Sequence, residues 1–146
     1  MTLKLRTGWR SDRSGASAVE FALVAPVFLA CLLGIVEFGR AMWIHNALQQ
    51  AAVAGARCEG IAQGSVGSTA ACGGASVTSY VQTVASGWGI TVPTSGISST
   101  TSTTCGGASG FSSVTITYTF STVAPQIVPA LASMPMSATA CFPNQP

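Results

Sequence analysis

The chain has 146 residues, of which 48% are hydrophobic and only 7% are charged. Soluble domains carry about 25% charged residues, so this composition excludes an ordinary cytosolic protein. Every charged residue lies at or before Glu59, and residues 60–146 carry none. The net charge of +2 is small, and the larger part of the chain has no basic patch, which argues against nucleic-acid binding.

A basic leader precedes an apolar segment at the N-terminal end. The leader, residues 1–15, contains four basic residues: Lys4, Arg6, Arg10 and Arg13. Residues 21–36 are uncharged, and with residues 16–19 and Phe38 they form a stretch long enough to cross a bilayer, which takes about 20 residues. The positive-inside rule then places the leader in the cytoplasm and residues 40–146 outside.

The pattern of apolar residues predicts that the helix continues beyond the membrane. After Gly39, apolar residues recur at steps of three and four, the spacing of one helix face: Ala41, Ile44, Leu48, Ala52 and Ala56. A single helix over residues 16–57 would measure about 63 Å and would span the membrane to about residue 38. Pro26 removes one backbone hydrogen bond, so we expect a bend in the first half.

Four of the five cysteines lie beyond the apolar segment, in the part predicted to be exported: Cys58, Cys72, Cys105 and Cys141. An even number in an exported domain predicts two disulfides. Three pairings are possible, and proximity along the chain favours Cys58–Cys72 and Cys105–Cys141. Zinc is the alternative, but the chain has no CxxC pair and a single histidine, His45.

Residues 58–146 are rich in Gly, Ser and Thr and indicate a small head with strands. Apolar residues at helical spacing predict a helix over residues 76–86. Strict alternation of apolar residues with threonines predicts a half-buried strand over residues 113–120. Residues 136–142 are expected to return as a strand beside it.

Three further segments of the head give weaker signals. Residues 88–92 are expected to begin a strand, and residues 125–132 to form a short helix. Nine of the eleven residues in 94–104 are Ser or Thr, which predicts a loop. The fold class is therefore α+β, in which a long N-terminal helix continues into a disulfide-braced head with a short antiparallel sheet.

Two sequence features, one at each end of the apolar helix, are more distinctive than a generic membrane span. Gly15 is followed by Glu20 and Phe21 where the helix begins, and the sequence GIVEFGR fills residues 34–40. With these features residues 14–40 resemble the TadE-like family, minor pseudopilins of the tight-adherence (Tad, or Flp) pilus machinery of bacteria. Residues 52–57 also resemble the small-residue run that follows in such proteins. Residues 114–120, a Pro-containing segment and residues 137–140 resemble the C-terminal part of the family more loosely.

The resemblance implies that a membrane prepilin peptidase cuts between Gly15 and Ala16 on the cytoplasmic side. Glycine suits such a site because an extended backbone without a side chain can enter the cleft of the peptidase. Glu20, with Phe21 after it, would then pair with the free amino group of a neighbouring subunit and set the register between subunits. The alternative is that Glu20 snorkels to water at the cytoplasmic interface, near the positive end of the helix dipole.

Other positions on the helix are candidates for packing or docking. Glu37 and Arg40 can pair on the helix surface, either as a docking pair for another pseudopilin or at the outer edge of the membrane. Ala30 and Gly34 are small residues four apart, which allows close packing of membrane helices. Trp43 fits an interfacial anchor.

The uncharged residues 60–146 offer no acid–base pair, so we expect neither an enzyme nor a cofactor or bound metal. The resemblance implies a structural assembly protein of the bacterial inner membrane, single-pass, with its N-terminus in the cytoplasm and its C-terminus in the periplasm. Its implied partners are other pilins and minor pseudopilins, the prepilin peptidase, the inner-membrane assembly platform and the lipid bilayer, without nucleic acid.

Three alternatives to this assembly protein remain. The first is a secreted protein with a cleaved signal peptide, and the second is a lipoprotein modified at Cys31. The third is a single-pass surface protein, adhesin-like, that is not incorporated in a pilus. Cleavage between Gly15 and Ala16 distinguishes a pilin-like protein from a plain anchor, which does not need it.

Overall fold

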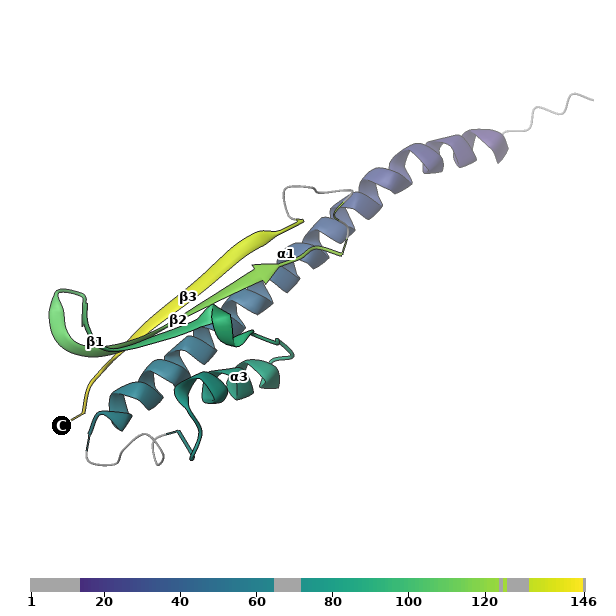
Figure 1. Ribbon diagram of the computed structural model, residues 1–146. Coiled ribbons are helices and arrows are strands. Elements are labelled where there is room, and N and C mark those ends of the chain that lie inside the picture. The colour runs from purple at the N-terminus through teal and green to yellow at the C-terminus, as the bar shows by residue number, and fades with distance from the viewer. Residues whose placement is uncertain (1–13, 65–71, 124, 126–131, 146) are drawn as a thin grey trace, which may run out of the picture. The chain divides into compact units, whose positions relative to one another are not determined.

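The computed structural model describes residues 14–64, 72–123, 125 and 132–145. Its elements are helix α1 (Ser14–Ala62), helix α3 (Val77–Gly87), the 3-10 turn η1 (Thr94–Gly96) and strands β1 (Ile97–Cys105), β2 (Ala108–Phe120) and β3 (Met134–Pro143) (Figure 1). The chain divides into two compact units, Met1–Phe38 and Gly39–Pro146. The second unit contains the sheet, α3 and the second half of α1.

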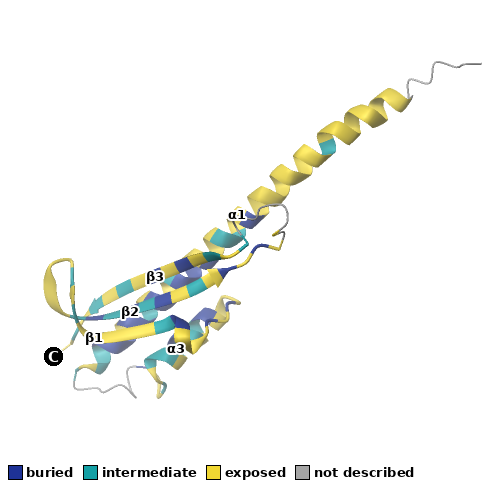
Figure 2. Cartoon of the chain, turned by 45° about the horizontal axis from the view of Figure 1, so that its top comes forward, coloured by how far each residue is buried: buried dark blue, intermediate teal, exposed yellow. Residues whose placement is uncertain are grey.

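The first half of α1 is mostly apolar, and residues 15–36 are exposed almost throughout (Figure 2). Glu37 is only 8% exposed. Between residues 15 and 36 no side chain is buried, and Ala25 alone is partly covered. Pro26 lies inside the helix, which continues on both sides of it. The leader falls almost entirely outside the described residues.

The second half of α1 supplies one side of the core of the head. The stripe expected from the sequence is confirmed, because Ile44, Leu48, Ala52 and Ala56 are buried and Ala41 is partly buried. Most of these side chains are alanine, so the helix backbone lies close to the elements that cover it. The helix ends at Ala62, several residues later than expected, and the head unit begins at Gly39, earlier than the expected boundary at Cys58.

The sheet is an antiparallel meander in the order β1-β2-β3. β2 alternates as expected, with Val114, Ile116 and Phe120 buried against the helices. β3 pairs with β2 without interruption from Phe111↔Pro143 to Phe120↔Met134, which confirms the returning strand. The expected α+β fold, with a long helix, a short antiparallel sheet and two disulfides, is therefore confirmed.

The expected loop over residues 94–104 is wrong, because most of it is strand β1. β1 pairs with β2 from Ile97↔Ile116 to Cys105↔Ala108, and Gly106 and Gly107 make the turn between them with positive φ. Threonine is β-branched and fits a strand, and an exposed edge strand can be polar on both faces. Its Ser and Thr residues therefore lack the alternation that reveals a half-buried strand.

Two other expectations for the head have different outcomes. Residues 88–92 form no strand, and they connect α3 to η1 with Ile90 and Val92 buried. The carbonyl of Val92 accepts a hydrogen bond from Nε2 of Gln82 at 2.9 Å, so this segment packs on α3 instead of joining the sheet. The helix expected over residues 125–132 lies almost wholly outside the described residues.

α3 was expected over residues 76–86 and is present with nearly the same bounds. Its N-cap is Ser76, whose hydroxyl accepts from the backbone N–H of Ser79 at 3.2 Å. α3 buries Val81 and Ala85 and runs antiparallel to the second half of α1 (Figure 1).

Candidate functional site: the N-terminal helix and the ends of the head

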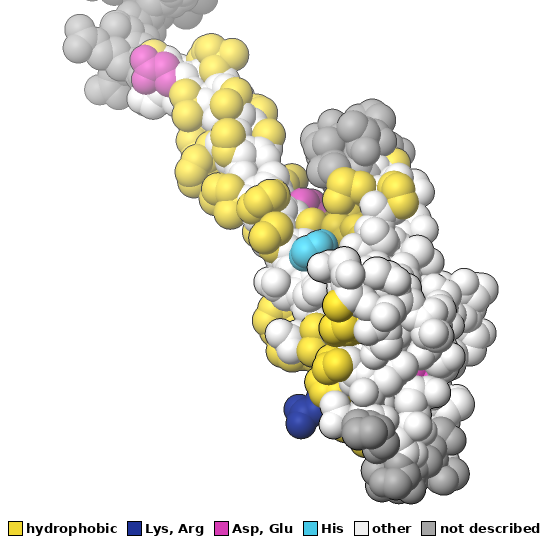
Figure 3. Space-filling model, turned by 90° about the vertical axis from the view of Figure 1, so that its left-hand side faces the viewer, with side chains coloured by type: hydrophobic (Ala, Val, Ile, Leu, Met, Phe, Trp, Pro, Cys, Tyr) yellow, Lys and Arg dark blue, Asp and Glu magenta, His cyan; other side chains and the backbone are white. Residues whose placement is uncertain are grey.

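The first half of α1 is long and apolar enough to cross a membrane. Its large side chains are more than two-fifths exposed, and Phe21 and Leu23 are each 72% exposed. Figure 3 shows these hydrophobic side chains covering the helix surface, whereas the surface of the head is mostly uncharged and polar. A helix with so much apolar surface needs lipid or other helices around it, which indicates membrane anchoring.

The expected processing and assembly residues lie at the start of this helix. Gly15 and Ala16 are in its first turn, and Glu20 and Phe21 are exposed in the next. A Cβ atom built at Gly15 would meet no described atom within 4 Å, and the same holds for Gly34. The packing of the described residues therefore requires glycine at neither position, although glycine in a helix costs about 1 kcal/mol relative to alanine.

Four of the expected residues share one side of the helix. At about 100° per residue, Glu20, Ala30, Gly34 and Glu37 fall within a sector of about 100°. Phe21 and Arg40 lie outside this sector. Glu37 is only 8% exposed, so a neighbouring helix could contact Glu20 and the small residues Ala30 and Gly34 on this face.

Arg40 interacts with strand β2 of the head. Its Nη2 donates a hydrogen bond to the carbonyl oxygen of Ser121 at 2.6 Å, and its guanidinium lies 4.8 Å from the centre of the Phe120 ring. These contacts join the start of the head's helix to the end of β2, a long-range role that the sequence did not reveal. The expected pairing of Arg40 with Glu37 stays a prediction.

Trp43 contacts a second tryptophan, Trp88, at the C-terminal end of α3. Their ring centroids are 5.4 Å apart with an interplanar angle of 67°, and Nε1 of Trp43 donates to the carbonyl of Trp88 at 3.4 Å. Trp88 was not singled out from the sequence, since nothing local marks it as a partner of α1. His45 is exposed on α1.

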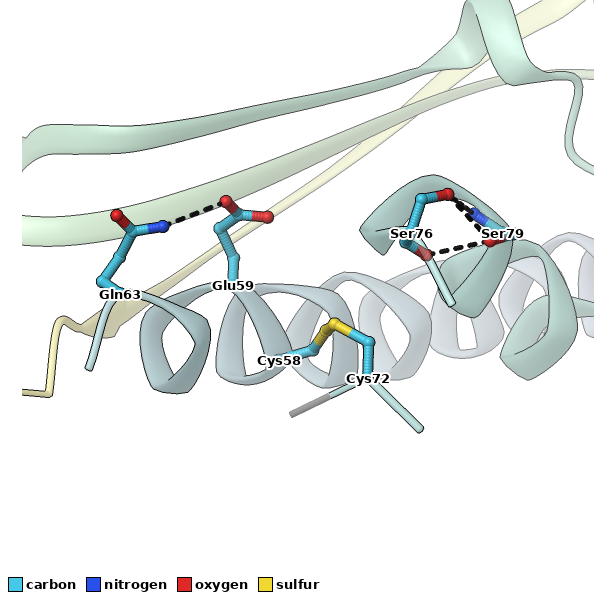
Figure 4. The surroundings of a disulfide bond; sticks show 6 residues. All are labelled: Cys58, Glu59, Gln63, Cys72, Ser76 and Ser79. Carbon is cyan, nitrogen blue, oxygen red and sulfur yellow. Dashed lines mark hydrogen bonds between the residues drawn. A yellow bond between two sulfur atoms is a disulfide. The ribbon is translucent and has the colours of Figure 1, made fainter. Parts of the chain in front are cut away.

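Both disulfides lie at the other end of the head. Cys58, near the end of α1, is joined to Cys72, which precedes α3, and Cys105 is joined to Cys141 at the hairpin end of the sheet (Figure 4 shows the first). These are the pairs that proximity along the chain favours. The four head cysteines are thus used in disulfides, and the described residues contain no group of three or more His, Cys, Asp or Glu that could hold a metal.

Glu59 is a buried carboxylate of the head, next in sequence to Cys58 of the first disulfide. It is 9% exposed and accepts a hydrogen bond from Nε2 of Gln63 at 3.3 Å (Figure 4). Burial raises the pKa of the Glu59 carboxyl above its ordinary value, because desolvation disfavours the charged form. The other ionisable side chains of residues 39–146 outside the disulfides are Arg40, His45, Arg57, Tyr80 and Tyr118.

The pH dependence of the head follows from Glu59. A carboxyl whose folded pKa is raised stabilises the fold most below its unfolded pKa, and this stability is lost as the pH rises through the folded pKa. We expect Glu59→Gln to be more stable than the natural chain at neutral pH and to lose less stability as the pH rises. Urea unfolding of the full chain in detergent, followed by tryptophan fluorescence, tests this. Equal pH slopes for the two proteins would contradict it.

These features define a protein with one long apolar N-terminal helix, which indicates membrane anchoring, and a small, disulfide-braced α+β head. Residues 15–57 match the model of the TadE-like protein family, which confirms the expected family over that segment. The match covers the apolar segment and most of the part of α1 that packs in the head, and it ends before the buried residues Cys58 and Glu59. Searches among curated proteins and among solved structures found no match.

Proposed function

We propose that this chain is a pseudopilin-like subunit that takes part in assembly of a Tad (Flp) pilus. The observation that carries the proposal is the TadE-like match over residues 15–57, which associates the chain with that pilus in general. The exposed apolar half of α1 supports it, because a subunit of this kind must exchange lipid for neighbouring helices. The structural role is to add one helix and one head to an assembly.

Processing is the first step of this function. A prepilin peptidase would cleave between Gly15 and Ala16 and leave the basic leader in the cytoplasm. The glycine at position 15 supports this proposal, since the described packing does not require it. A glycine without a packing role among the described residues is consistent with a requirement set by another molecule, here the cleft of the peptidase.

Assembly follows processing in this proposal. Glu20 would pair with the amino group that cleavage creates on a neighbouring subunit, because a carboxylate within lipid needs a partner. Ala30 and Gly34 lie on the same side of α1 and would let a neighbouring helix approach closely. The docking partners would be other pilins or pseudopilins and the inner-membrane assembly platform.

The proposed topology has residues 1–15 in the cytoplasm, the membrane span from residue 16 to about residue 38, and the head in the periplasm or in the pilus. The disulfides support this orientation, because disulfides persist in an oxidising compartment such as the periplasm. The basic leader supports it as well, through the positive-inside rule.

Processing is tested by the mass and N-terminal sequence of the protein from membranes, with and without the cognate peptidase. We expect a peptidase-dependent start at Ala16, and we expect Gly15→Val to keep its leader because a branched side chain obstructs the cleft. Gly34→Ala, in the same helix, is the matched control and should be cleaved normally. A chain that still starts near Met1 would favour a plain anchor, and a start at lipidated Cys31 would make it a lipoprotein.

The role of Glu20 is tested on the same strains. Glu20→Gln should be cleaved normally but should be lost from fibres sheared off the cell surface, because the amide cannot form the ion pair. Glu20→Asp keeps the charge and should retain part of the incorporation. Normal incorporation of Glu20→Gln would remove the ion pair from the proposal and leave the interfacial, snorkelling role of Glu20.

A further inference from the structure

A groove in the surface of the head lies between the second half of α1 and the start of α3. Its volume is about 360 Å³, and six of the residues that line it are Gln50, Val53, Ala54, Arg57, Ile61 and Tyr80. The five from α1 share one face of the helix, along which the backbone rises about 16 Å. All six belong to the unit Gly39–Pro146, so the groove is a feature of the head alone.

The three polar side chains of this groove can all donate hydrogen bonds. They are the guanidinium of Arg57, the amide of Gln50 and the phenol of Tyr80. Arg57 and Gln50 are exposed, and Tyr80 is half-buried. None of the three side chains has a hydrogen-bond or ion-pair partner among the described residues. The groove therefore gathers donors that the fold does not use, and its described lining contains no carboxylate to accept from them.

Arg57 is also the only exposed charged side chain in the described part of the head beyond Arg40. The other charged residue there, Glu59, is 9% exposed and accepts a hydrogen bond from Gln63. Residues two apart on a helix do not face each other, so Glu59 does not pair with Arg57. The head of a second copy likewise has no exposed acidic side chain among its described residues. Charge complementarity therefore requires an acidic group from a different protein.

Apolar side chains lie on both sides of Arg57 along the groove. Val53, one turn before Arg57, is 48% exposed, and Ile61 is one turn after it. A helix of a partner can match this row, because residues four apart share a face and an acidic residue can stand between two apolar ones. A phospholipid matches the row less well, because its charged phosphate is not flanked by apolar groups on both sides.

We propose that this groove is a docking site for an acidic, amphipathic helix of another protein. A Glu or Asp side chain of that helix accepts hydrogen bonds from Arg57, and apolar side chains one turn away on either side pack on Val53 and Ile61. A hydrogen bond between ionised groups is about twice as strong as a neutral one, so Arg57 selects for the carboxylate. This contact goes beyond the proposed function, because it requires neither cleavage after Gly15 nor pairing of Glu20.

The test uses the ¹⁵N-labelled full chain in a nonionic detergent and follows two sets of NMR signals: the side-chain Nε–Hε groups of the arginines and the backbone amides of residues 50–61. Two alanine-rich helical peptides are the probes. Each has leucine four residues before and four residues after a central residue, which is Glu in one peptide and Gln in the other. Arg40 is the internal control, because its guanidinium already donates to Ser121. Micelles that contain phosphatidylglycerol, without peptide, test an anionic lipid.

We expect the Glu peptide to shift the Arg57 signal saturably and to leave the Arg40 signal in place. It should bind about tenfold more tightly than the Gln peptide, a factor typical of a hydrogen bond to a charged group. Arg57→Gln should bind the two peptides equally, as followed on the backbone amides. Val53→Ser should weaken both peptides by the same factor, because it removes only apolar contact.

Equal affinity of the natural chain for the two peptides, or no saturable shift with either, would overturn the inference. A shift of Arg57 with phosphatidylglycerol as large as that with the Glu peptide would also overturn it and would assign the groove to lipid headgroups. Each of these outcomes leaves the proposed function standing, because that function is tested separately by the N-terminal sequence of the protein and by its incorporation into fibres.

Discussion

A double variant that replaces Cys105 and Cys141 by serine is expected to lose about 4 kcal/mol of unfolding free energy. The disulfide between them closes a loop with a sequence separation of 36 residues. Without this disulfide the unfolded chain gains conformational entropy, which lowers the free energy of the unfolded state by about 4 kcal/mol for a loop of this length. The bond joins the hairpin turn of β1 and β2 to the end of β3, so its loss also frees the hairpin end of the sheet.

Chemical unfolding of the full chain in detergent, followed by the fluorescence of Trp43 and Trp88, measures this loss. The Cys58/Cys72 double serine variant should lose less, about 3 kcal/mol, because its sequence separation is only 14 residues. Cys31→Ser serves as the control and should leave the head unchanged, since this free cysteine lies in the first unit. A larger loss for Cys58/Cys72 than for Cys105/Cys141 would contradict the prediction.

The same change, glycine to alanine, is expected to have opposite effects at two positions of α1. Gly55 is buried, and a Cβ atom there would overlap Cγ2 of Val81 and lie 3.4 Å from Cγ1 of Val114. Overpacking of this kind costs about 1–3 kcal/mol, and the contacts come from both α3 and β2, so Gly55→Ala should destabilise the head. Gly55→Val adds two more methyl groups and should destabilise it further.

Gly39 provides the control, because a Cβ atom there meets nothing within 4 Å among the described residues. Gly39→Ala should stabilise the helix by about 1 kcal/mol, through the lower entropy of the unfolded chain and the better helix propensity of alanine. The unfolding midpoints of the two variants in detergent, compared at constant m-value, test whether the two substitutions have opposite effects on stability. A stabilised Gly55→Ala would mean that α1 does not approach α3 and β2 as closely as the structure has it.

The elements that the sequence predicted well are those that carry their own periodicity. α1 has an apolar stripe at helical spacing, and β2 alternates between apolar residues and threonines. The spacing therefore indicates whether each segment is a helix or a strand and which of its faces is buried. α3 has a serine cap and a similar spacing. The apolar segment needs only its length and lack of charge.

The contacts at the two ends of the head were not predictable in the same way. Arg40 reaches Ser121, and Trp43 reaches Trp88, across long stretches of sequence with no local signal for either pairing. In the sequence Glu59 looks like an ordinary exposed carboxylate on a helix, and only the folded structure shows that it is buried. Each of these contacts depends on which faces of the helices and strands pack together after folding. The periodicity of a single segment does not predict that packing.

By itself, the sequence determined that this protein has a basic N-terminal segment, one apolar helix, four cysteines beyond the apolar segment and no charged residue in residues 60–146. These properties follow from composition and local spacing, which hold whatever the chain packs against. The tertiary structure alone decided that residues 97–105 form a strand, because a polar edge strand is defined by its hydrogen bonds to β2. It also decided that Gly55 is a point of close contact, because a missing side chain matters only where another element occupies its place.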